Sequence, residues 1–451
     1  MRILSPTGHL GFTPIERGSF DIGVSQRPDA IVADSGSCDI GPQPLGADEH
    51  CSPDEWQRHD LELMLLAARQ LGVPMIVGSA SDAGTDRGVH QYAEIIRELA
   101  RRHGLAPFNL ATIFSEVSRD EVARRLRSGV RVEGLDGRPD LTQEVLARTD
   151  RLVAVMGVEP IIQALDQGAD VVIAGRAGDS CLFAAPAIRA GFPEAAAYYL
   201  GKVLECASFA GEPFMGKESI IGTVTPDAVS VTAMHPGQRC TVASVASHAM
   251  YERASPFFEH VAGGVLDMTH CRYEQVDERT TRVSGFAFRR DAVYRIKLEG
   301  SGKSASARCP SPGSATRTPS ATSMPSSAGR ARRCRSAGAA GRALSALLPR
   351  LRARRRHGPV GASARRARAR AVPGGRGRRA ALGGRRGHLR AGHAEPLLRA
   401  APRGQGTAGT AALMMDEVLR GKPGYEWTVN HVLPLADPLE LTTVKLEVVG
   451  R

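Results

Sequence analysis

The chain has 451 residues, 42% of them apolar, which allows a large core and excludes a small disulfide-stapled protein. Its eight cysteines form no CxxC pair and no Cys/His spacing typical of zinc sites, so we expect free thiols. The net charge is +12, yet residues 301–410 hold 25 of the 59 basic residues and only one of the 47 acidic residues. Because the rest of the chain is acidic, we expect no nucleic-acid partner for its globular part.

We expect neither a membrane-spanning helix nor a signal peptide in this sequence. No run of eighteen apolar residues occurs, so no membrane-spanning helix is expected. The N-terminal sequence MRILSPTGHLGF lacks the charged, apolar and small-residue order of a signal peptide. We therefore expect a cytoplasmic protein with no membrane partner.

Short apolar runs alternate with helical patterns from residue 1 to 175. Ser52 and Glu55 predict a capping box, and Gly72 ends the helix that follows. This alternation indicates an α/β fold with a doubly wound, mostly parallel sheet, Rossmann-like in order. The GxGxxG spacing is absent after each predicted strand, so we expect no NAD or FAD. The predicted strands are 3–4, 30–33, 73–77, 109–114 and 130–135, and the predicted helices are 54–71, 89–102, 118–127 and 142–149.

The stretch 151–183 organises this half of the chain. Residues 152–156 and 171–174 are apolar runs of strand length, and a helical pattern between them ends at Gly168. A crossover this short predicts parallel neighbours in one buried sheet. The polar cluster Arg176, Asp179 and Ser180 should then emerge at the carboxyl edge of the sheet, where open α/β sheets bind ligands.

The C-terminal half predicts a smaller α+β portion. We place the α/β domain at 1–210 and the α+β portion at 211–300, with a return to it at 404–451. Helical patterns cover 183–190, 193–209, 240–254 and 414–419, and strand patterns cover 220–224, 228–234, 283–288, 292–300, 426–432 and 439–449.

The segment 301–403 has a different composition, dominated by Arg, Ala, Gly, Ser and Pro and without an aromatic residue. It fits a disordered linker, because it has too few apolar groups to offset its chain entropy. A nucleic-acid-binding tail is a second interpretation. The third is out-of-frame translation of GC-rich DNA: with permitted codons for residues 312–319, a shifted frame encodes Gly-Ile-Arg-Asp-Pro-Asp-Ala.

Acidic and polar side chains follow several of the predicted strands. Asp34 and Asp39 follow the second strand, Ser79 and Asp82 follow the third, and Asp179 follows the strand at 171–174. Taken singly, each aspartate fits a turn or helix-cap role. Converging at one edge, they could hold a divalent metal such as Mg²⁺ or divide acid and base roles.

Arg176, Glu205 and Arg239 complete the candidate site. Arg176 could bind a carboxylate or phosphate in bidentate fashion, or pair with Asp179 to shape its loop. Glu205, in an otherwise apolar helix, could act as a base. Arg239, at a predicted helix start after a Pro-Gly turn, could take part in an anion site.

Six short motifs occur in an order that resembles the acyclic terpene utilisation (AtuA-like) family. The resemblance covers about 1–300 and returns from 404 onward, and the shifted frame would restore a Gly-Ile-Arg-Asp-Pro motif of that family. It implies a role in degrading branched or terpenoid acids as coenzyme A thioesters. The motifs are 33–37 with Asp39 and 41–42, 76–80, 156–160, 175–179, 204–206 and 264–267.

Two functional hypotheses follow. The first is a catabolic enzyme, of lyase, hydratase or hydrolase class, acting on a branched carboxylic acid or an acyl-CoA thioester by hydration, isomerisation or hydrolysis. The second is a non-catalytic binding or scaffold subunit that partners a pathway enzyme. Either could form a homo-oligomer. Converging acids would favour catalysis, whereas a broad apolar patch with scattered acids would favour a scaffold.

Overall fold

The structure, a computed structural model, describes residues 1–252, 255–310 and 418–450. Residues 1–307 and 420–451 form one compact unit, and the second unit, 308–419, is described only at its two ends. The linker, tail and out-of-frame interpretations of 301–403 therefore fall almost wholly outside the described residues. Residues 418 and 419, predicted as the end of a helix, begin a strand instead, and the rest of that predicted helix lies outside the described residues.

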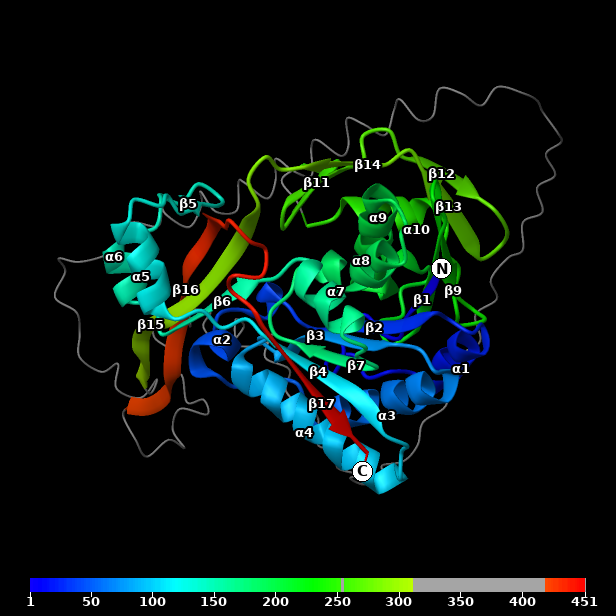
Figure 1. Ribbon diagram of the computed structural model, residues 1–451, viewed down its shortest axis with the longest axis horizontal. Helices are drawn as coiled ribbons and strands as arrows, with labels where there is room; N and C mark the ends of the chain where they lie inside the picture. The colour runs from blue at the N-terminus through cyan, green and yellow to red at the C-terminus, as the bar shows by residue number, and fades with distance from the viewer. Residues whose placement is uncertain (253–254, 311–417, 451) are drawn as a thin grey trace, which may run out of the picture. The chain divides into compact units, whose positions relative to one another are not determined.

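A ten-stranded mixed sheet forms the centre of the first unit (Figure 1). Its five middle strands pair in parallel, and the strands beyond them on both edges are antiparallel. The α/β class is thus as predicted, but the sheet has more antiparallel strands than expected. In sheet order the strands are β12 (Arg272–Gln275), β13 (Thr280–Ser284), β9 (Ala228–Ala233), β8 (Ile220–Val224), β1 (Arg2–Ser5), β2 (Ala30–Gly36), β3 (Met75–Asp82), β7 (Val171–Ala174), β4 (Phe108–Phe114) and β17 (Thr443–Val449).

Helices cover both faces of this sheet (Figure 1). Successive strand residues alternate between two cores: Ile31 packs with the helices on one face and Val32 with those on the other. Ile31 and Val32 are both fully buried, as a strand covered on both faces requires. One layer contains α1 (Arg17–Ser25), α3 (Asp54–Leu71) and α4 (Asp86–His103), and the other contains α7 (Glu159–Asp166), α8 (Asp179–Arg189) and α9 (Glu194–Leu204).

The predicted pairing of the strands at 152–156 and 171–174 is wrong. The first of them is β6 (Arg151–Val155), which pairs antiparallel with β15 (Arg295–Pro310) in a separate sheet. The segment after β6 meets the segment after β7 through a single parallel bridge, between Met156 and Ala177. β7 instead lies between β3 and β4. The local strand–helix–strand pattern was correct, but the choice of partner strand depends on residues near 300.

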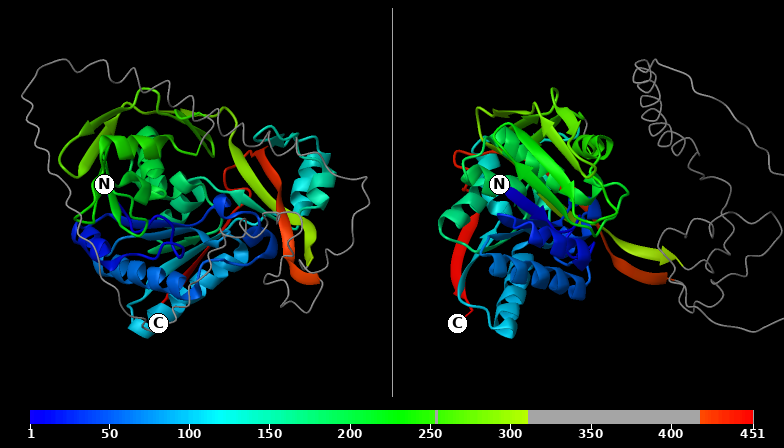
Figure 2. Two further views of the ribbon diagram at one scale, coloured as in Figure 1. Left: turned by 180° about the vertical axis from the view of Figure 1, so that it is seen from behind. Right: turned by 90° about the vertical axis from the view of Figure 1, so that its right-hand side faces the viewer.

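Two smaller antiparallel sheets complete the unit. β15 and β16 are neighbours in one of them and lie side by side in both views of Figure 2. The four-stranded sheet contains β5 (Glu133–Gly134), β16 (Val418–Pro434), β15 and β6; the three-stranded sheet contains β10 (Phe258–Val261), β11 (Gly264–Asp267) and β14 (Ala287–Arg290); the remaining helices are α2 (Gln43–Ala47), α5 (Arg119–Arg127), α6 (Gln143–Ala147) and α10 (Val242–Met250).

The start of α3 differs from the predicted capping box. Pro53 is the N-cap residue and accepts no side-chain cap bond, while the Ser52 hydroxyl donates to the carboxylate of Asp82. Gly72 ends the helix in the left-handed conformation, as expected.

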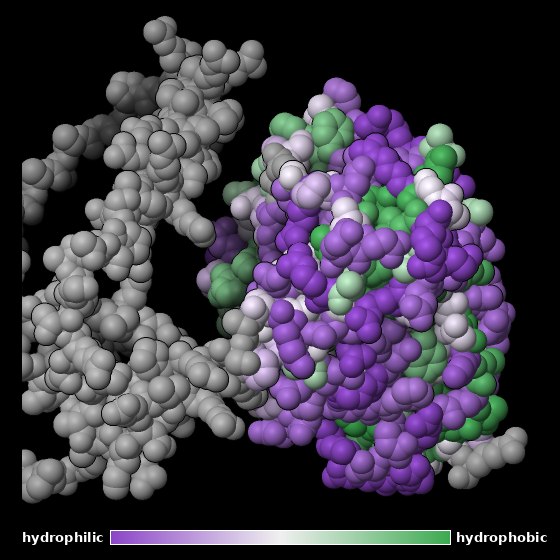
Figure 3. Space-filling model, turned by 90° about the vertical axis from the view of Figure 1, so that its left-hand side faces the viewer, coloured by the Kyte–Doolittle hydropathy of each residue, from purple (hydrophilic) through white to green (hydrophobic). Residues whose placement is uncertain are grey.

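Of the helices that the structure describes, none has the length and apolar character needed to cross a bilayer. The side drawn in Figure 3 is mainly hydrophilic, with apolar groups in small separate areas.

Candidate functional site

Four parallel strands end at the same edge of the large sheet, and each is followed by polar side chains. β1 leads to His9, β2 carries Asp34 near its end, β3 ends in Ser79 and Asp82, and β7 leads to Arg176. Asp179 begins α8 three residues later. The carboxyl edge of parallel strands is where α/β folds bind their ligands, so this edge is the candidate site.

The end of β3 has an unusual backbone. Ser79, Ser81 and Asp82 have φ angles of 48°, 58° and 71°, in the left-handed region that non-glycine residues rarely adopt. Gly36 of β2 fits against this turn, because an added Cβ there would lie 2.3 Å from the carbonyl oxygen of Asp82. Strained backbone of this kind concentrates at functional sites, where the surrounding structure maintains it.

Arg176 is buried at the centre of the edge, with 5% of its surface exposed. Its Nε donates to Glu299 Oε2 at 2.9 Å, and its Nη1 donates to Ser79 Oγ at 3.1 Å. The same Nη1 lies 3.4 Å from Asp179 Oδ1 and from the carbonyl oxygen of Gly36. The guanidinium therefore joins the ends of β2, β3 and β7 to β15.

Glu299 is the principal counter-ion of Arg176, and it also accepts from Lys297 Nζ at 2.7 Å. Burial alone would raise the pKa of Glu299, but Arg176 and Lys297 hold that pKa at about 2. Glu299 is consequently a carboxylate at physiological pH. Its charge keeps the buried guanidinium paired.

Asp34 and Asp179 form a pair of neighbouring carboxyl groups. Burial raises the pKa of Asp34 well above its ordinary value, and the charge of Asp179 and a hydrogen bond to it raise the pKa further. Arg176 and the hydroxyl of Ser79 act in the opposite direction. Asp179 is the more open partner, with 41% of its side chain exposed. Two carboxyl groups in unequal surroundings can serve one as proton donor and one as carboxylate.

Asp82 is fully engaged within the protein. One carboxylate oxygen accepts from the backbone N–H groups of Cys51 and Ser52, at 2.6 and 2.9 Å, and the hydroxyl of Ser52 binds both oxygens. These bonds attach the loop before α3 to the end of β3. The predicted role of Asp82 in binding substrate is therefore less well supported than an anchoring role.

Glu205 lies in a second buried cluster. It is the C-cap residue of α9, pairs with Lys202, and accepts from the Tyr251 hydroxyl at 3.1 Å. Burial raises its pKa, Lys202 lowers it, and the charge of Asp179 raises it again. The pKa of Glu205 thus responds to the charge of Asp179. Its predicted position inside a helix is corrected to the helix end.

Asp39 is exposed at the margin of the candidate site. Its side chain hydrogen-bonds Glu252. Burial of Glu252, together with Asp39 and the charge of Glu205, raises the pKa of Glu252 to about 7. Asp39 follows the β2 loop within a short 3-10 helix, Cys38–Ile40. Asp39 and Glu252 thus connect the Glu205 cluster to the end of β2.

Arg239 lies apart from this group. Its side chain is exposed and its ion pair, at 3.8 Å, is with Glu278. The helix expected to begin at Arg239 starts at Val242, with Thr241 as its cap. Arg239 therefore does not provide an anion site at a helix start as predicted.

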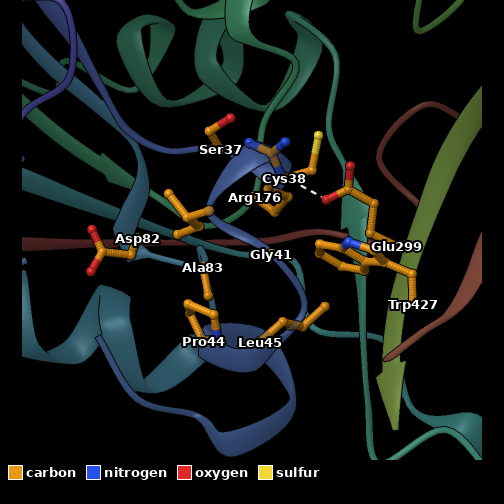
Figure 4. A pocket seen from close by; sticks show the side chains of 11 residues that line it. Ser37, Cys38, Gly41, Pro44, Leu45, Asp82, Ala83, Arg176, Glu299 and Trp427 are labelled. Carbon is orange, nitrogen blue, oxygen red and sulfur yellow. Dashed lines mark hydrogen bonds and ion pairs between the residues drawn. The ribbon is translucent and has the colours of Figure 1, made fainter. Parts of the chain in front are cut away.

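A small hollow opens beside Arg176 and Glu299, with Trp427 of β16 at its rim (Figure 4). The space within it is about 230 Å³, including the part open to solvent. The volume comparable with published cavity volumes is only about 10 Å³, room for about one water molecule, against about 300–1,000 Å³ for typical small-molecule pockets. A substrate larger than a few atoms would therefore extend outside this hollow. Other lining residues are Ser37, Cys38, Ile40, Gly41, Pro44, Leu45, Asp82 and Ala83.

The described part of the chain has no preformed ligand set for the expected divalent metal. No group of three or more His, Cys, Asp or Glu side chains there is arranged to hold an ion. Mg²⁺ binding therefore stays a prediction, which a metal titration followed by calorimetry can test.

Three residues of this edge were not predicted: His9, Lys297 and Glu299. The signal for Lys297 and Glu299 was present, because they alternate with Ile296 and Leu298 and so share one strand face. Nothing in the sequence indicated which sheet that face would meet. His9 could have been found by applying to the first strand the strand-end argument used for the others.

The fold and its polar strand edge define an α/β protein with a candidate active site at the carboxyl ends of parallel strands. The family described as acyclic terpene utilisation family protein AtuA matches residues 1–303, and the chain belongs to this family. No curated protein and no solved structure matched the chain.

Proposed function

We propose that this protein is a cytoplasmic enzyme of acyclic terpene utilisation that acts on a branched carboxylic acid or its coenzyme A thioester. The observation that carries the proposal is the Asp34–Asp179 pair beside a buried Arg176 at the carboxyl edge of the sheet. Family membership supports the pathway. The reaction is general acid–base chemistry of the hydration, isomerisation or hydrolysis type.

Asp34 is the proposed general acid. Burial and Asp179 raise its pKa, so Asp34 keeps a proton at a pH where an ordinary aspartate has lost it. A protonated carboxyl group can donate to an oxygen on which negative charge develops, as on a thioester carbonyl. Asp179 supplies the charge that holds this proton and is open enough to contact a ligand.

Arg176 and Ser79 position this pair. The Nη1 group of Arg176 contacts both Ser79 Oγ and Asp179 Oδ1, while Glu299 holds the Nε side. Bidentate binding of a substrate carboxylate by Arg176 would require one of these partners to move. A positioning role therefore fits the geometry better than the direct substrate contact considered from sequence.

An exposed aromatic patch suits an apolar substrate chain. We define it as Phe12, Phe209 and Phe214, whose side chains are 47%, 49% and 60% exposed. Phe209 stacks on Phe214 at 4.9 Å and contacts Tyr251 at 5.5 Å. Tyr251 in turn donates to Glu205. Phe209 and Phe214 are thus linked to the Glu205 cluster through Tyr251, and Phe12 contacts His9.

The same patch supports the alternative of a scaffold subunit, since exposed aromatic residues also mark protein interfaces. The two functions differ in what happens at the carboxyl pair. A scaffold needs the patch but not a protonated Asp34. The convergence of Asp34, Asp179 and Glu205 is therefore the reason to prefer catalysis.

The test is a ligand and turnover screen on the full chain. A panel of branched carboxylic acids and thioesters, including 3-methylbutanoyl-coenzyme A, is screened for thermal stabilisation. At about 100 times Kd a ligand should stabilise the fold by about 2.7 kcal/mol. Turnover of the stabilising compound should fall about 100- to 10,000-fold in Asp34→Asn. The control is Asp21→Asn, an exposed helix position paired only with Arg17.

Two results would count against the proposal. One is the absence of stabilisation by any acid or thioester. The other is full turnover in Asp34→Asn, which would remove the carboxyl pair from the chemistry.

A further inference from the structure

His9 lies at the same sheet edge as the carboxyl pair, in the loop that follows β1. Its backbone is held by a tight turn, in which the His9 N–H donates to Thr13 Oγ1 and the Thr13 N–H donates to the His9 carbonyl, both at 2.9 Å. The ring packs against Phe12 of the aromatic patch, with 5.4 Å between ring centroids. His9 thus lies between the polar cluster and the patch.

The Nε2 atom of His9 is buried and has no hydrogen-bond partner among the described residues. Its nearest carboxylate oxygen is Asp82 Oδ1, at 4.0 Å, which is too far for a hydrogen bond. Asp82 is already occupied by Cys51 and Ser52. A buried polar atom without a partner is uncommon in proteins, and a bound molecule at a functional site is one established explanation.

Burial of the ring favours its neutral form. Burial lowers the pKa of His9 most strongly; Asp82, the Ser35 backbone and Asp179 raise it, and Arg176 lowers it. The net direction is downward, so the ring is neutral at physiological pH. A neutral imidazole with an unpaired, unprotonated nitrogen is a competent proton acceptor.

We propose that His9 is the general base of the site, with Nε2 taking a proton from the substrate or from an attacking water. This inference rests on the proposed function, in which Asp34 is the acid. In the step, the X–H bond breaks toward His9 Nε2 while the proton of Asp34 passes to the atom that gains negative charge. The enzyme changes from neutral His9 and neutral Asp34 to imidazolium and carboxylate, and a proton returned through solvent restores it.

The three groups then have separate tasks. His9 removes a proton, Asp34 donates one, and Asp179 holds the proton on Asp34 and stabilises the imidazolium. Glu205, Asp39 and Asp82 are not needed as the base. The pH profile should therefore have an acidic limb from His9 and an alkaline limb from Asp34.

The test compares His9→Asn with His260→Gln, an exposed histidine on β10. On a thioester that wild type turns over, His9→Asn should lose about 100- to 10,000-fold in kcat with KM nearly unchanged, and the acidic limb should disappear. His260→Gln should match wild type. Retention of both kcat and the acidic limb in His9→Asn would overturn the proposal.

A second readout does not depend on turnover. In protein labelled with ¹⁵N in its histidine rings, the His9 signals are assigned by their loss in His9→Asn. At pH 7 they should report an unprotonated Nε2. A proton on Nε2 at that pH would overturn the assignment of His9 as the base. If instead Nε2 is unprotonated but no compound is turned over, the proposed function fails while the state of His9 stands.

Discussion

Arg176 Nε lies 2.9 Å from Glu299 Oε2, and both side chains are almost completely buried. The two residues are 123 positions apart in the chain. Their contact joins the end of β7 in the large sheet to β15 in the four-stranded sheet. Everything proposed for the carboxyl pair depends on the position that this contact gives the guanidinium.

Glu299→Gln should destabilise the fold by about 3–5 kcal/mol, because it leaves a buried guanidinium without its principal counter-ion. The matched control is Glu98→Gln, which breaks an exposed pair with Arg58 and should cost at most about 1 kcal/mol. Urea unfolding of both variants at pH 7 measures the difference. Equal effects would mean that the buried pair is no more important than a surface pair.

The same pair predicts a pH dependence. The pKa of Glu299 is about 2 in the fold, against 4.5 in an unfolded chain. Its contribution is therefore present above pH 4.5 and is lost as the pH falls toward 2. As the pH falls from 4.5 toward 2, the free energy of unfolding of wild type should decrease by this contribution. Glu299→Gln lacks the carboxylate, so its free energy of unfolding should not decrease for this reason. Parallel pH dependences in the two proteins would contradict the assignment.

Asp34→Asn should stabilise the protein while removing activity. Because burial and Asp179 raise the pKa of Asp34 in the fold, the unfolded chain releases this proton first as the pH rises past 3.8. Wild type then loses stability relative to the variant until the pH passes the folded pKa. Melting temperatures of both proteins at pH 4 and pH 8 test this. A smaller gain at pH 8 than at pH 4 would contradict it.

Gly36→Ala should disturb the site through the backbone. Its Cβ would lie 2.3 Å from the Asp82 carbonyl and 2.7 Å from the Ser79 Cβ, so β2 and β3 must separate. We expect a loss of at least about 2 kcal/mol in stability. Gly18→Ala is the control, since an added Cβ there meets nothing within 4 Å and helix α1 should gain up to about 1 kcal/mol. Thermal melts that rank the two variants in the opposite order would be inconsistent with the packing described.

Phe209→Ala should weaken binding of the acyl chain without changing the chemistry. Loss of one aromatic contact predicts a rise in KM of roughly 5- to 30-fold with kcat retained. Val276→Ala, an exposed apolar position on a different loop, is the control. Light scattering on the same variants tests the scaffold alternative: unchanged KM together with a lost oligomer would assign the patch to a protein interface.

The sequence predicted the strand ends well and their partners poorly. Asp34, Ser79, Arg176 and Asp179 were predicted together because each follows an apolar run, a local signal. The partners of β6 and β15 depend on pairing between residues almost 150 positions apart, which no local periodicity encodes.

Three further differences have local causes. Ser52 was predicted to cap α3 but bonds Asp82, because a tertiary carboxylate competed successfully with the helix end. Arg239 was assigned to a helix start that lies three residues further on. His9 was overlooked because the first strand, with only two apolar residues recognised, was not followed to its end.

The most direct test of the central claim is the pKa of Asp34 itself. It can be measured from the side-chain carboxyl ¹³C signal of labelled protein, in wild type and in Asp179→Asn. The account predicts a pKa well above 3.8 in wild type that falls when the Asp179 charge is removed. A wild-type Asp34 that titrates near 3.8, or one indifferent to Asp179→Asn, would contradict it.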